Sequence, residues 1–360
     1  MLPVASMAET VDVTTRINHI QVIGTHNSYH AGIGKSEQRL WLPEHLNLLA
    51  SLQYIHPSLT RQLDGGVRQL ELDVYADHAG GRYAYPMGPK RVAKAGMPAD
   101  PDFDPEHVMT MPGFKVMHVP DLDYRSVCQP FTACLNEIRT WSHAHPRHIP
   151  VFILIEPKED VPKWAFPAAK PEPMDRAAFD ALDAEIRSVF ASDEIFTPDD
   201  VRGASDTLNH AIMTRGWPTL AQSRGKVVFL LDVRQLGPIY LQGHPSLKNR
   251  VLFTNAQAGT PDAAFIEINT PDEHTIAQRV REGYLVRTRS DDPDDAITPA
   301  SYVRRDIALA SGAHIVSTDY PLSKPEAASG FHVQMPGGAM MRCNPLNAPK
   351  TCRSLELSPS

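Results

Sequence analysis

The stretch Ile20–His30 combines residue types that can move a proton and bind a cation. It reads IQVIGTHNSYH, so a mostly apolar run leads into His26 and Asn27. A histidine can donate or accept a proton near neutral pH. An asparagine offers a neutral amide oxygen, which suits a hard cation such as calcium. The pattern predicts a buried strand that ends at a functional mouth.

A second stretch, Gln69–Asp77, carries two acids at strand spacing. It reads QLELDVYAD, with Glu71 and Asp73 two residues apart. Since side chains of a strand alternate, both carboxylates face the same side. Two acids on one face are costly unless a cation or a proton neutralises them, and oxygen ligands favour calcium. The alternative is an ordinary strand whose acids form structural ion pairs.

The elements that must position these residues alternate between strands and helices. Eight short buried strands are expected, with Val251–Thr254 as a spare candidate: Ile20–Ile23, Val67–Tyr75, Phe114–Val119, Val151–Ile155, Lys226–Val233, Ala263–Ile268, Tyr284–Thr288 and His314–Thr318. Strand–helix alternation predicts a parallel sheet. Eight units predict an α/β fold of the closed, TIM-like (β/α)8 barrel type. A weak helix between Val233 and Ala263 makes the expected barrel irregular.

Helical periodicity is clearest in four segments. Apolar spacing and caps predict helices over Phe131–His145, Asp175–Phe190, Glu273–Glu282 and Thr298–Ala310. The segment His78–Gly113 is rich in Gly, Pro and Met and shows no period, so we expect a long loop over the mouth. The histidines of HAHPRH, which ends at His148, are expected to be solvated at a helix end.

The carboxyl ends of the strands collect the polar residues. They supply His26, Asn27, Glu71, Asp73, His118, Glu156, Lys158, Arg287, Arg289 and Asp319. In a barrel of this type the active site lies at these ends. Several carboxylates around one point need a cation, and basic residues beside them need an anion, so a metal with a phosphate satisfies both. A regular strand would point the neighbours His26 and Asn27 to opposite sides, so this strand must twist or end there.

Length and composition fit one domain. The chain has 360 residues, 42% of them hydrophobic, and a net charge of −7. The charge argues against a nucleic-acid partner, and no apolar run approaches the ~20 residues of a membrane span. We expect a single catalytic domain over 1–360, with a core at about 18–321 and a disulfide-stapled tail at 322–360. Met1–Thr15 lacks the pattern of a signal peptide.

Four cysteines form two local pairs. Cys128 and Cys134 are six residues apart, and Cys343 and Cys352 are nine apart. An even number at short spacing favours two disulfides in a secreted or periplasmic protein. The alternative is four reduced thiols in a cytoplasmic protein.

An ordered set of motifs resembles the phosphatidylinositol-specific phospholipases C. The motifs GTHNSYH, QLELDVYAD, VMHVPDLD and FILIEPKED occur in this order. The resemblance spans about Ile20–Pro321 and is strongest to the calcium-dependent, single-domain microbial branch. The closing GAHIVSTDYP also resembles the final strand of glycerophosphodiester phosphodiesterases, although those usually open with His-Arg where this chain has His-Asn.

The resemblance implies a role for each site residue. His26 and His118 would be the catalytic pair, and Glu156 would be a calcium ligand. One of the ligand carboxylates, with Glu156 as the candidate, would take a proton, and the identity of this base stays open. Asn27, Glu71 and Asp73 would be the other calcium ligands, and Lys158 and Arg287 would contact the phosphate or the inositol hydroxyls. Asp121 or Asp123 is expected to hold the His118 ring.

The implied activity is calcium-dependent cleavage of phosphatidylinositol, or of a glycosylated inositol phospholipid, to diacylglycerol and inositol 1,2-cyclic phosphate. We expect a monomer that contacts a membrane surface transiently. Two alternatives remain open: a glycerophosphodiester phosphodiesterase, and a non-catalytic secreted barrel that binds calcium or sugar phosphates. Pure binding would require neither His26 nor His118.

Overall fold

The fold comes from a computed structural model that describes residues 7–41, 52, 54–160, 169–292, 297–321, 330–354 and 357. Its strands are β1 Ile20–Thr25, β2 Gln69–Tyr75, β3 Lys115–Val116, β4 Val151–Pro157, β5 Val227–Leu231, β6 Leu252–Thr254, β7 Phe265–Glu267, β8 Leu285–Arg289, β9 Ile315–Thr318 and β10 Met341–Cys343.

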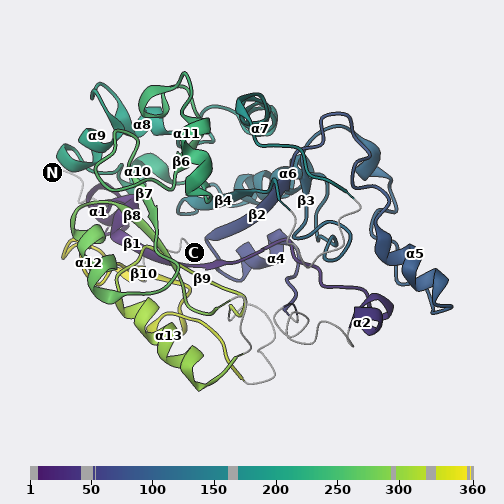
Figure 1. The fold of residues 1–360 in the computed structure, drawn as a ribbon. Coiled ribbons are helices and arrows are strands. Elements are labelled where there is room, and N and C mark those ends of the chain that lie inside the picture. The colour runs from purple at the N-terminus through teal and green to yellow at the C-terminus, as the bar shows by residue number, and fades with distance from the viewer. Residues whose placement is uncertain are drawn as a thin grey trace.

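Helices separate most of these strands (Figure 1). The α-helices are α1 Met7–Thr14, α2 Lys35–Trp41, α4 Leu59–Asp64, α5 Met87–Lys94, α6 Phe131–Ala144, α7 Arg176–Val189, α8 Pro198–Arg202, α9 Leu208–Thr214, α10 Leu220–Ser223, α11 Gly237–Tyr240, α12 Glu273–Arg281 and α13 Pro299–Ala310. Short 3-10 helices cover Ile17–His19, Val108–Thr110, Arg234–Leu236, Pro245–Leu247 and Pro336–Gly338. Within the described residues, no helix has the length and apolar character needed to cross a bilayer.

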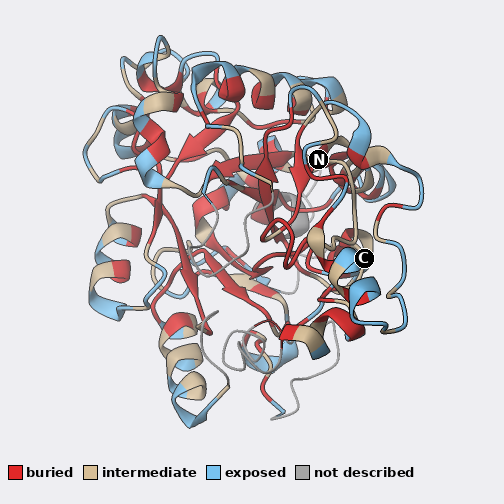
Figure 2. Cartoon of the chain, turned by 45° about the vertical axis from the view of Figure 1, so that its right-hand side comes forward, coloured by how far each residue is buried: buried red, intermediate tan, exposed pale blue. Residues whose placement is uncertain are grey.

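The expected parallel barrel is confirmed. The strands run in the order β6-β5-β4-β2-β1-β9-β8-β7, and every neighbouring pair on this path is parallel. One parallel bridge between Asn255 and Phe265 joins the two ends, so the barrel is nearly closed. Buried residues run along the strands, while the helices alternate between buried and exposed faces (Figure 2).

The assignment of Phe114–Val119 to a barrel strand is wrong. Only Lys115–Val116 forms a strand, β3, and it pairs antiparallel with Val74 and Tyr75 at the end of β2. β1 meets β2 only at Gly24 and Gln69, so the end of β2 extends past β1 and leaves a free edge for β3. The spare candidate Val251–Thr254 supplies the missing barrel strand, β6.

Two smaller expectations are also corrected. The segment predicted as a loop contains α5, which starts after Pro86 and buries Val92. A helix of about two turns with internal Gly and Pro gives too short a period to recognise. His148 is buried rather than solvated, because its ring bonds to the Ser142 hydroxyl and to the Ile149 carbonyl.

The predicted long helices form because each has one apolar face. In α6 the buried residues Phe131, Leu135, Ile138 and Trp141 recur at helical spacing. Asp175 caps α7 by accepting a hydrogen bond from the Ala178 amide. Both expected disulfides are present, Cys128–Cys134 and Cys343–Cys352.

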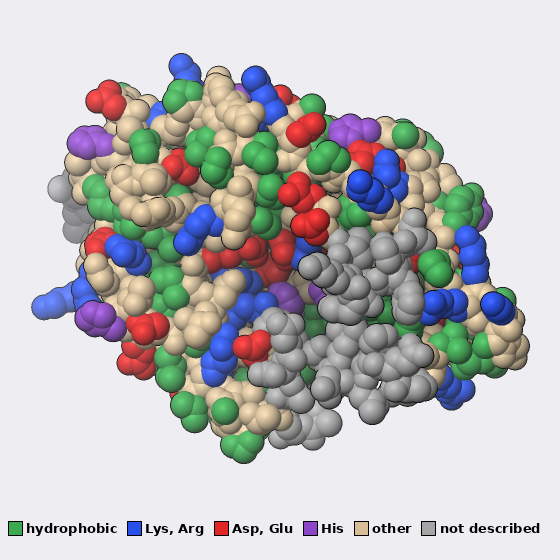
Figure 3. All heavy atoms as spheres, viewed as in Figure 1, with side chains coloured by type: hydrophobic (Ala, Val, Ile, Leu, Met, Phe, Trp, Pro, Cys, Tyr) green, Lys and Arg blue, Asp and Glu red, His purple; other side chains and the backbone are tan. Residues whose placement is uncertain are grey.

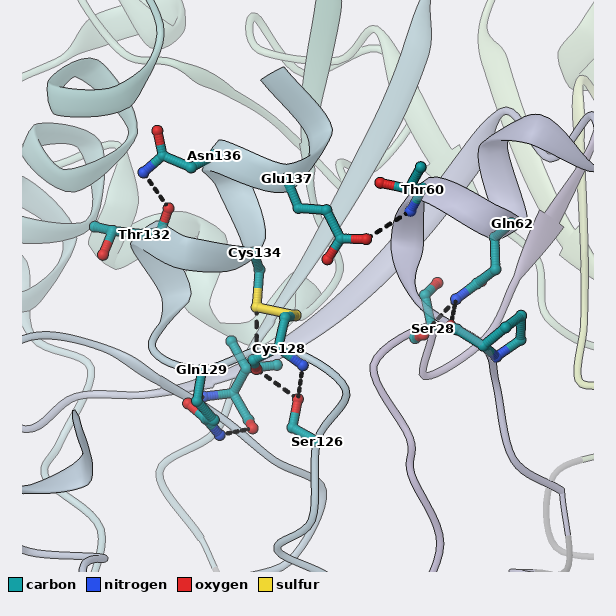
Figure 4. Close-up of a disulfide and its surroundings, with 12 residues drawn as sticks. Ser28, Thr60, Gln62, Ser126, Cys128, Gln129, Thr132, Cys134, Asn136 and Glu137 are labelled. Atoms are coloured by element: carbon teal, nitrogen blue, oxygen red, sulfur yellow. Dashed lines mark hydrogen bonds between the residues drawn. A yellow bond between two sulfur atoms is a disulfide. The ribbon is translucent and has the colours of Figure 1, made fainter. Parts of the chain in front are cut away.

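Each disulfide links a loop to a neighbouring helix or strand. The Cys128–Cys134 bond joins the chain before α6 to that helix, and the Ser126 hydroxyl donates to the Cys128 carbonyl beside it (Figure 4). In the tail, β10 pairs antiparallel with Ile20–Val22 of β1, and Cys343 at its end bonds to Cys352.

Candidate functional site

Three acids meet inside the barrel at the carboxyl ends of β2 and β4. Glu71 and Asp73 lie on the same face of β2, and Asp73 is directly paired with Glu156 in the register with β4. One oxygen from each of the three carboxylates lies within 4.8 Å of the others. Glu71 and Asp73 are buried, and Glu156 is partly buried. The sequence expectation that these acids converge is confirmed as a matter of geometry.

The backbone turns sharply between His26 and Asn27, directly after β1. β1 ends at Thr25, and Asn27 adopts the left-handed conformation with φ +43°. This turn breaks the strand alternation that would have pointed the two side chains apart. The Asn27 amide donates to the Tyr54 hydroxyl, while its Oδ1 is buried and accepts no hydrogen bond from the residues that the structure describes.

The His26 ring lies between two carboxylates. Its Nδ1 is 2.9 Å from Asp319 Oδ1 at the end of β9, and its Nε2 is 3.6 Å from Glu71 Oε1. Burial, followed by the positive charges of Arg289 and Arg287, lowers the pKa of His26 well below its ordinary value. Because a carboxylate accepts hydrogen bonds, Nδ1 carries the proton and Nε2 is left for chemistry.

The electrostatics of the acids indicate that they need a cation. Burial raises the pKa of Glu71 to about 7 despite the charge of Arg287, and burial raises the pKa of Asp73 as well. Glu156 differs: burial opposes its charge, but the Lys158 ammonium holds its pKa below the usual value. A bound divalent cation would stabilise all three ionised forms.

The donor set fits calcium. The oxygens of the three carboxylates and the unpartnered Oδ1 of Asn27 are hard ligands of the kind that calcium prefers. Among the described residues, Asp73 Oδ1 likewise is buried and has no hydrogen-bond partner. Both orphaned oxygens would be satisfied by a cation, and leaving them unpaired is unfavourable.

The Lys158 ammonium contacts two of the three acids directly. Its Nζ is 3.1 Å from Asp73 Oδ2 and donates a hydrogen bond to Glu156 Oε1. Its side chain also lines a pocket of about 660 Å³ together with His118, Tyr75 and Leu236. The residue can therefore reach both the acids and a molecule in the pocket.

The two arginines of β8 have different surroundings. The Arg287 guanidinium donates to Glu71 Oε2 and to Asn269 Oδ1, and it lies 3.5 Å from Glu267. In the described part of the chain, Nε and Nη2 of Arg289 are buried and have no hydrogen-bond partner. Arg287 also has a buried Nε without a partner among these residues, but Arg289 has two such donors. Sequence reasoning noted Arg289 only as a strand-end residue.

His118 lies outside the barrel strands but faces the same mouth. It follows β3, and its ring is held by Asp123, whose Oδ2 is 2.9 Å from His118 Nδ1. Asp121 instead accepts from the backbone amides of Met87 and Ala169. The His118 side chain also lines the pocket of about 660 Å³ described above.

Two further acids extend the buried cluster. Asp232 follows β5 and Glu267 ends β7, and burial raises the pKa of both. Sequence reasoning left Asp232 undecided and missed Glu267. Glu267 could have been recognised from its position, because it is the last residue of the strand FIE and so lies at a strand end.

A space-filling view shows where these charged side chains reach the surface. Acidic, basic and histidine side chains gather in a hollow near the middle of one face of the molecule (Figure 3). Such a mixture of charges can hold a cation, an anion and a proton-transfer group close together.

Comparison with known proteins agrees with this geometry. The family model of the calcium-dependent phosphoinositide phospholipases C matches residues 15–345. No curated protein has a sequence that matches significantly.

Among solved structures, a calcium-dependent phosphoinositol-specific phospholipase C from a Pseudomonas species has a similar fold. Its TM-score is 0.55 at 17% identity, covering 92% of this chain and 96% of that chain. A calcium-dependent phosphatidylinositol-specific phospholipase C from Streptomyces antibioticus gives 0.52 at 19% identity, covering 85% and 95%. The match over most of the sequence places this chain in the family of calcium-dependent phosphoinositide phospholipases C.

Proposed function

We propose that the protein cleaves phosphatidylinositol, or a glycosylated inositol phospholipid, to diacylglycerol and inositol 1,2-cyclic phosphate. The observation that carries this proposal is the convergence of Glu71, Asp73 and Glu156 next to His26, with His118 on the adjoining pocket. The inositol 2-hydroxyl lies next to the phosphodiester, so holding it in line makes the attack intramolecular.

Calcium would be held by Asn27, Glu71, Asp73 and Glu156. When bound, it lowers the pKa of a coordinated hydroxyl and offsets charge on a phosphoryl oxygen. Isothermal titration tests the ligand set: Glu71→Gln should bind calcium far more weakly than the wild type. Equal binding by both proteins would remove Glu71 from the site.

The proton from the 2-hydroxyl has two candidate acceptors. We propose Glu156, which the Lys158 ammonium keeps ionised. His26 is the second candidate, because its Nδ1 is committed to Asp319 and its lowered pKa leaves Nε2 unprotonated. Turnover by Glu156→Gln at saturating calcium would assign the base to His26, whereas loss of turnover at calcium saturation favours Glu156.

The remaining groups would act on the phosphate and the leaving oxygen. Once its Nε2 has taken a proton, His26 can donate to the phosphoryl group, and His118 Nε2 gives a proton to the departing diacylglycerol oxygen. Arg289 has the unused donors that an anion requires, while Lys158 and Arg287 contribute positive charge nearby.

Analysis of the products tests the reaction. Phosphorus NMR of phosphatidylinositol treated with the protein should show inositol 1,2-cyclic phosphate with calcium and no turnover with chelator. Cleavage of a substrate that lacks the 2-hydroxyl would refute the cyclising route and favour a glycerophosphodiester phosphodiesterase.

We also propose that one catalytic domain acts outside the cytoplasm as a monomer. Two disulfides are typical of proteins in oxidising compartments. A lipid substrate requires transient contact with a membrane surface. Sedimentation of the protein with phosphatidylinositol vesicles, but not with vesicles of neutral lipid alone, would support this contact, and equal sedimentation with both would contradict its dependence on the inositol lipid.

A further inference from the structure

His118 is the exposed end of a buried chain of three side chains. Its Nδ1 lies 2.9 Å from Asp123 Oδ2, and Asp123 in turn lies 2.9 Å from Nε2 of His30. The other nitrogen of His30, Nδ1, lies 2.8 Å from the backbone carbonyl of Tyr54. The side chains of His30 and Asp123 are 0% exposed, whereas that of His118 is 24% exposed.

The partners of His30 define its charge. A carbonyl oxygen and an ionised carboxylate can only accept hydrogen bonds. Both ring nitrogens of His30 face such acceptors, so both must carry a proton, and only the imidazolium form does so. Burial opposes this charge, but the pKa of His30 is raised by the charge of Asp123 and by its hydrogen bonds.

Backbone contacts hold the chain of side chains in place. His30 forms an antiparallel bridge with Ser126, and the Val127 amide donates to the Tyr29 carbonyl. A tight turn pairs Val119 with Asp123 and so brings Asp123 back beneath His118. The Cys128–Cys134 disulfide fixes the end of this segment to α6.

Asp123 therefore contacts both the buried imidazolium of His30 and the candidate general acid His118. An unbalanced carboxylate is unfavourable in a low-dielectric interior. Because His30 already balances its charge, Asp123 can stay ionised in the interior and orient the His118 ring through Nδ1. Other charged groups also face His118. Its pocket is lined by Lys158, Glu159 and Asp160. At longer range, the charge of His118 interacts with His26 and Glu156.

We propose that His30 is a positioning residue for the acid step: through Asp123 it fixes the His118 ring in the orientation that proton transfer to the leaving group requires. This inference rests on the proposed function. His30 does not touch the substrate, since it is fully buried behind Asp123.

Comparison of two leaving groups tests the proposal. His30→Gln removes the cation but keeps a donor for Asp123. On phosphatidylinositol, whose alkoxide needs a proton, kcat should fall about tenfold or more with little change in KM. On the nitrophenyl ester of inositol phosphate, whose leaving group needs none, kcat should stay within about twofold. Adding Asp123→Asn should recover part of the loss on the lipid, because the unbalanced charge is then gone.

His148→Gln is the matched control, because it makes the same change at another buried histidine, one whose ring bonds to Ser142. His148→Gln should change kcat by the same factor on both substrates. Equal losses on both substrates for His30→Gln would overturn the proposal.

Nitrogen NMR of the wild type gives a readout that does not depend on turnover or on a folded variant. Both ring nitrogens of His30 should be protonated at neutral pH, and a neutral ring would overturn the inference. If the wild type cleaves neither substrate while His30 is an imidazolium, the proposed function fails and the charge assignment stands.

Discussion

Replacing Lys158 by methionine should lower the stability of the calcium-free protein and enlarge the stabilisation that calcium provides. The Lys158 ammonium lies 3.1 Å from Asp73 and also donates to Glu156. Calcium requires oxygens of the same two carboxylates. The lysine therefore stabilises the acids in the absence of metal and competes with the metal for them.

The magnitude follows from the geometry. At an effective dielectric constant of about 20, two unit charges at the 3.1 Å separation of Lys158 and Asp73 attract by roughly 5 kcal/mol. Desolvation offsets part of this, and removing one partner of a buried pair costs about 3 kcal/mol. For 360 residues the unfolding entropy is roughly 0.75 kcal/mol per degree, so the Tm in chelator should fall by about 4 °C.

Calcium should then reverse part of the loss. Without a competing ammonium, a tenfold gain in calcium affinity corresponds to about 1.4 kcal/mol. At saturating calcium this gain adds about 2 °C to the calcium-induced rise in Tm. Lys158→Met should therefore lose stability in chelator and show a larger response to calcium than the wild type.

Thermal denaturation in chelator and in a calcium series measures both effects. Lys94→Met removes the same charge from the exposed side of α5 and serves as the control, with the wild-type response expected. If Lys158→Met responds to calcium no more than the wild type, the lysine and the metal do not share the acids and the reasoning is wrong.

Three further predictions concern the acid, the tail and a buried histidine. His118→Ala should cost on the order of 10²–10⁴ in rate on phosphatidylinositol and far less on the nitrophenyl ester; equal losses would show that the acid lies elsewhere. Replacing Cys343 and Cys352 by serine opens a loop with a sequence separation of nine, so urea denaturation should show a loss of about 2.7 kcal/mol, and no loss would mean that the tail does not contribute through this bond. Burial lowers the pKa of His148 from 6.5 to about 4. Between these values the unfolded chain binds a proton that the folded protein does not, so the free energy of unfolding falls as pH drops, by up to about 3 kcal/mol. His148→Gln should flatten this dependence between pH 7 and 4.5, and an unchanged slope would contradict the assignment.

Much of the fold could be predicted because it depends on local patterns. Continuous apolar runs such as Val151–Ile155 are typical of strands buried on both faces, and their alternation with amphipathic helices favours a parallel barrel. The spacing of Glu71 and Asp73 alone places both carboxylates on one face of β2. The short spacings of the cysteines similarly predicted both disulfides.

The placement of β3 and β6 could not be read from the sequence. Phe114–Val119 and Val251–Thr254 are both short apolar runs, and which one enters the barrel depends on edge pairing between strands distant in sequence. The same applies to His148, whose burial depends on the Ser142 hydroxyl and on the packing of the following chain.

The sequence by itself determined which residue types reach the carboxyl ends of the strands, because that follows from periodicity and chain order. Only the tertiary structure decided their partners. It placed the Arg287 guanidinium against Glu71 and brought His30 to Asp123 across 93 positions of sequence. It also left two donors of Arg289 without a partner in the described part of the chain. The physical reason is that charge state and hydrogen bonding depend on distances of a few ångströms between strands and loops, and chain packing alone sets these distances.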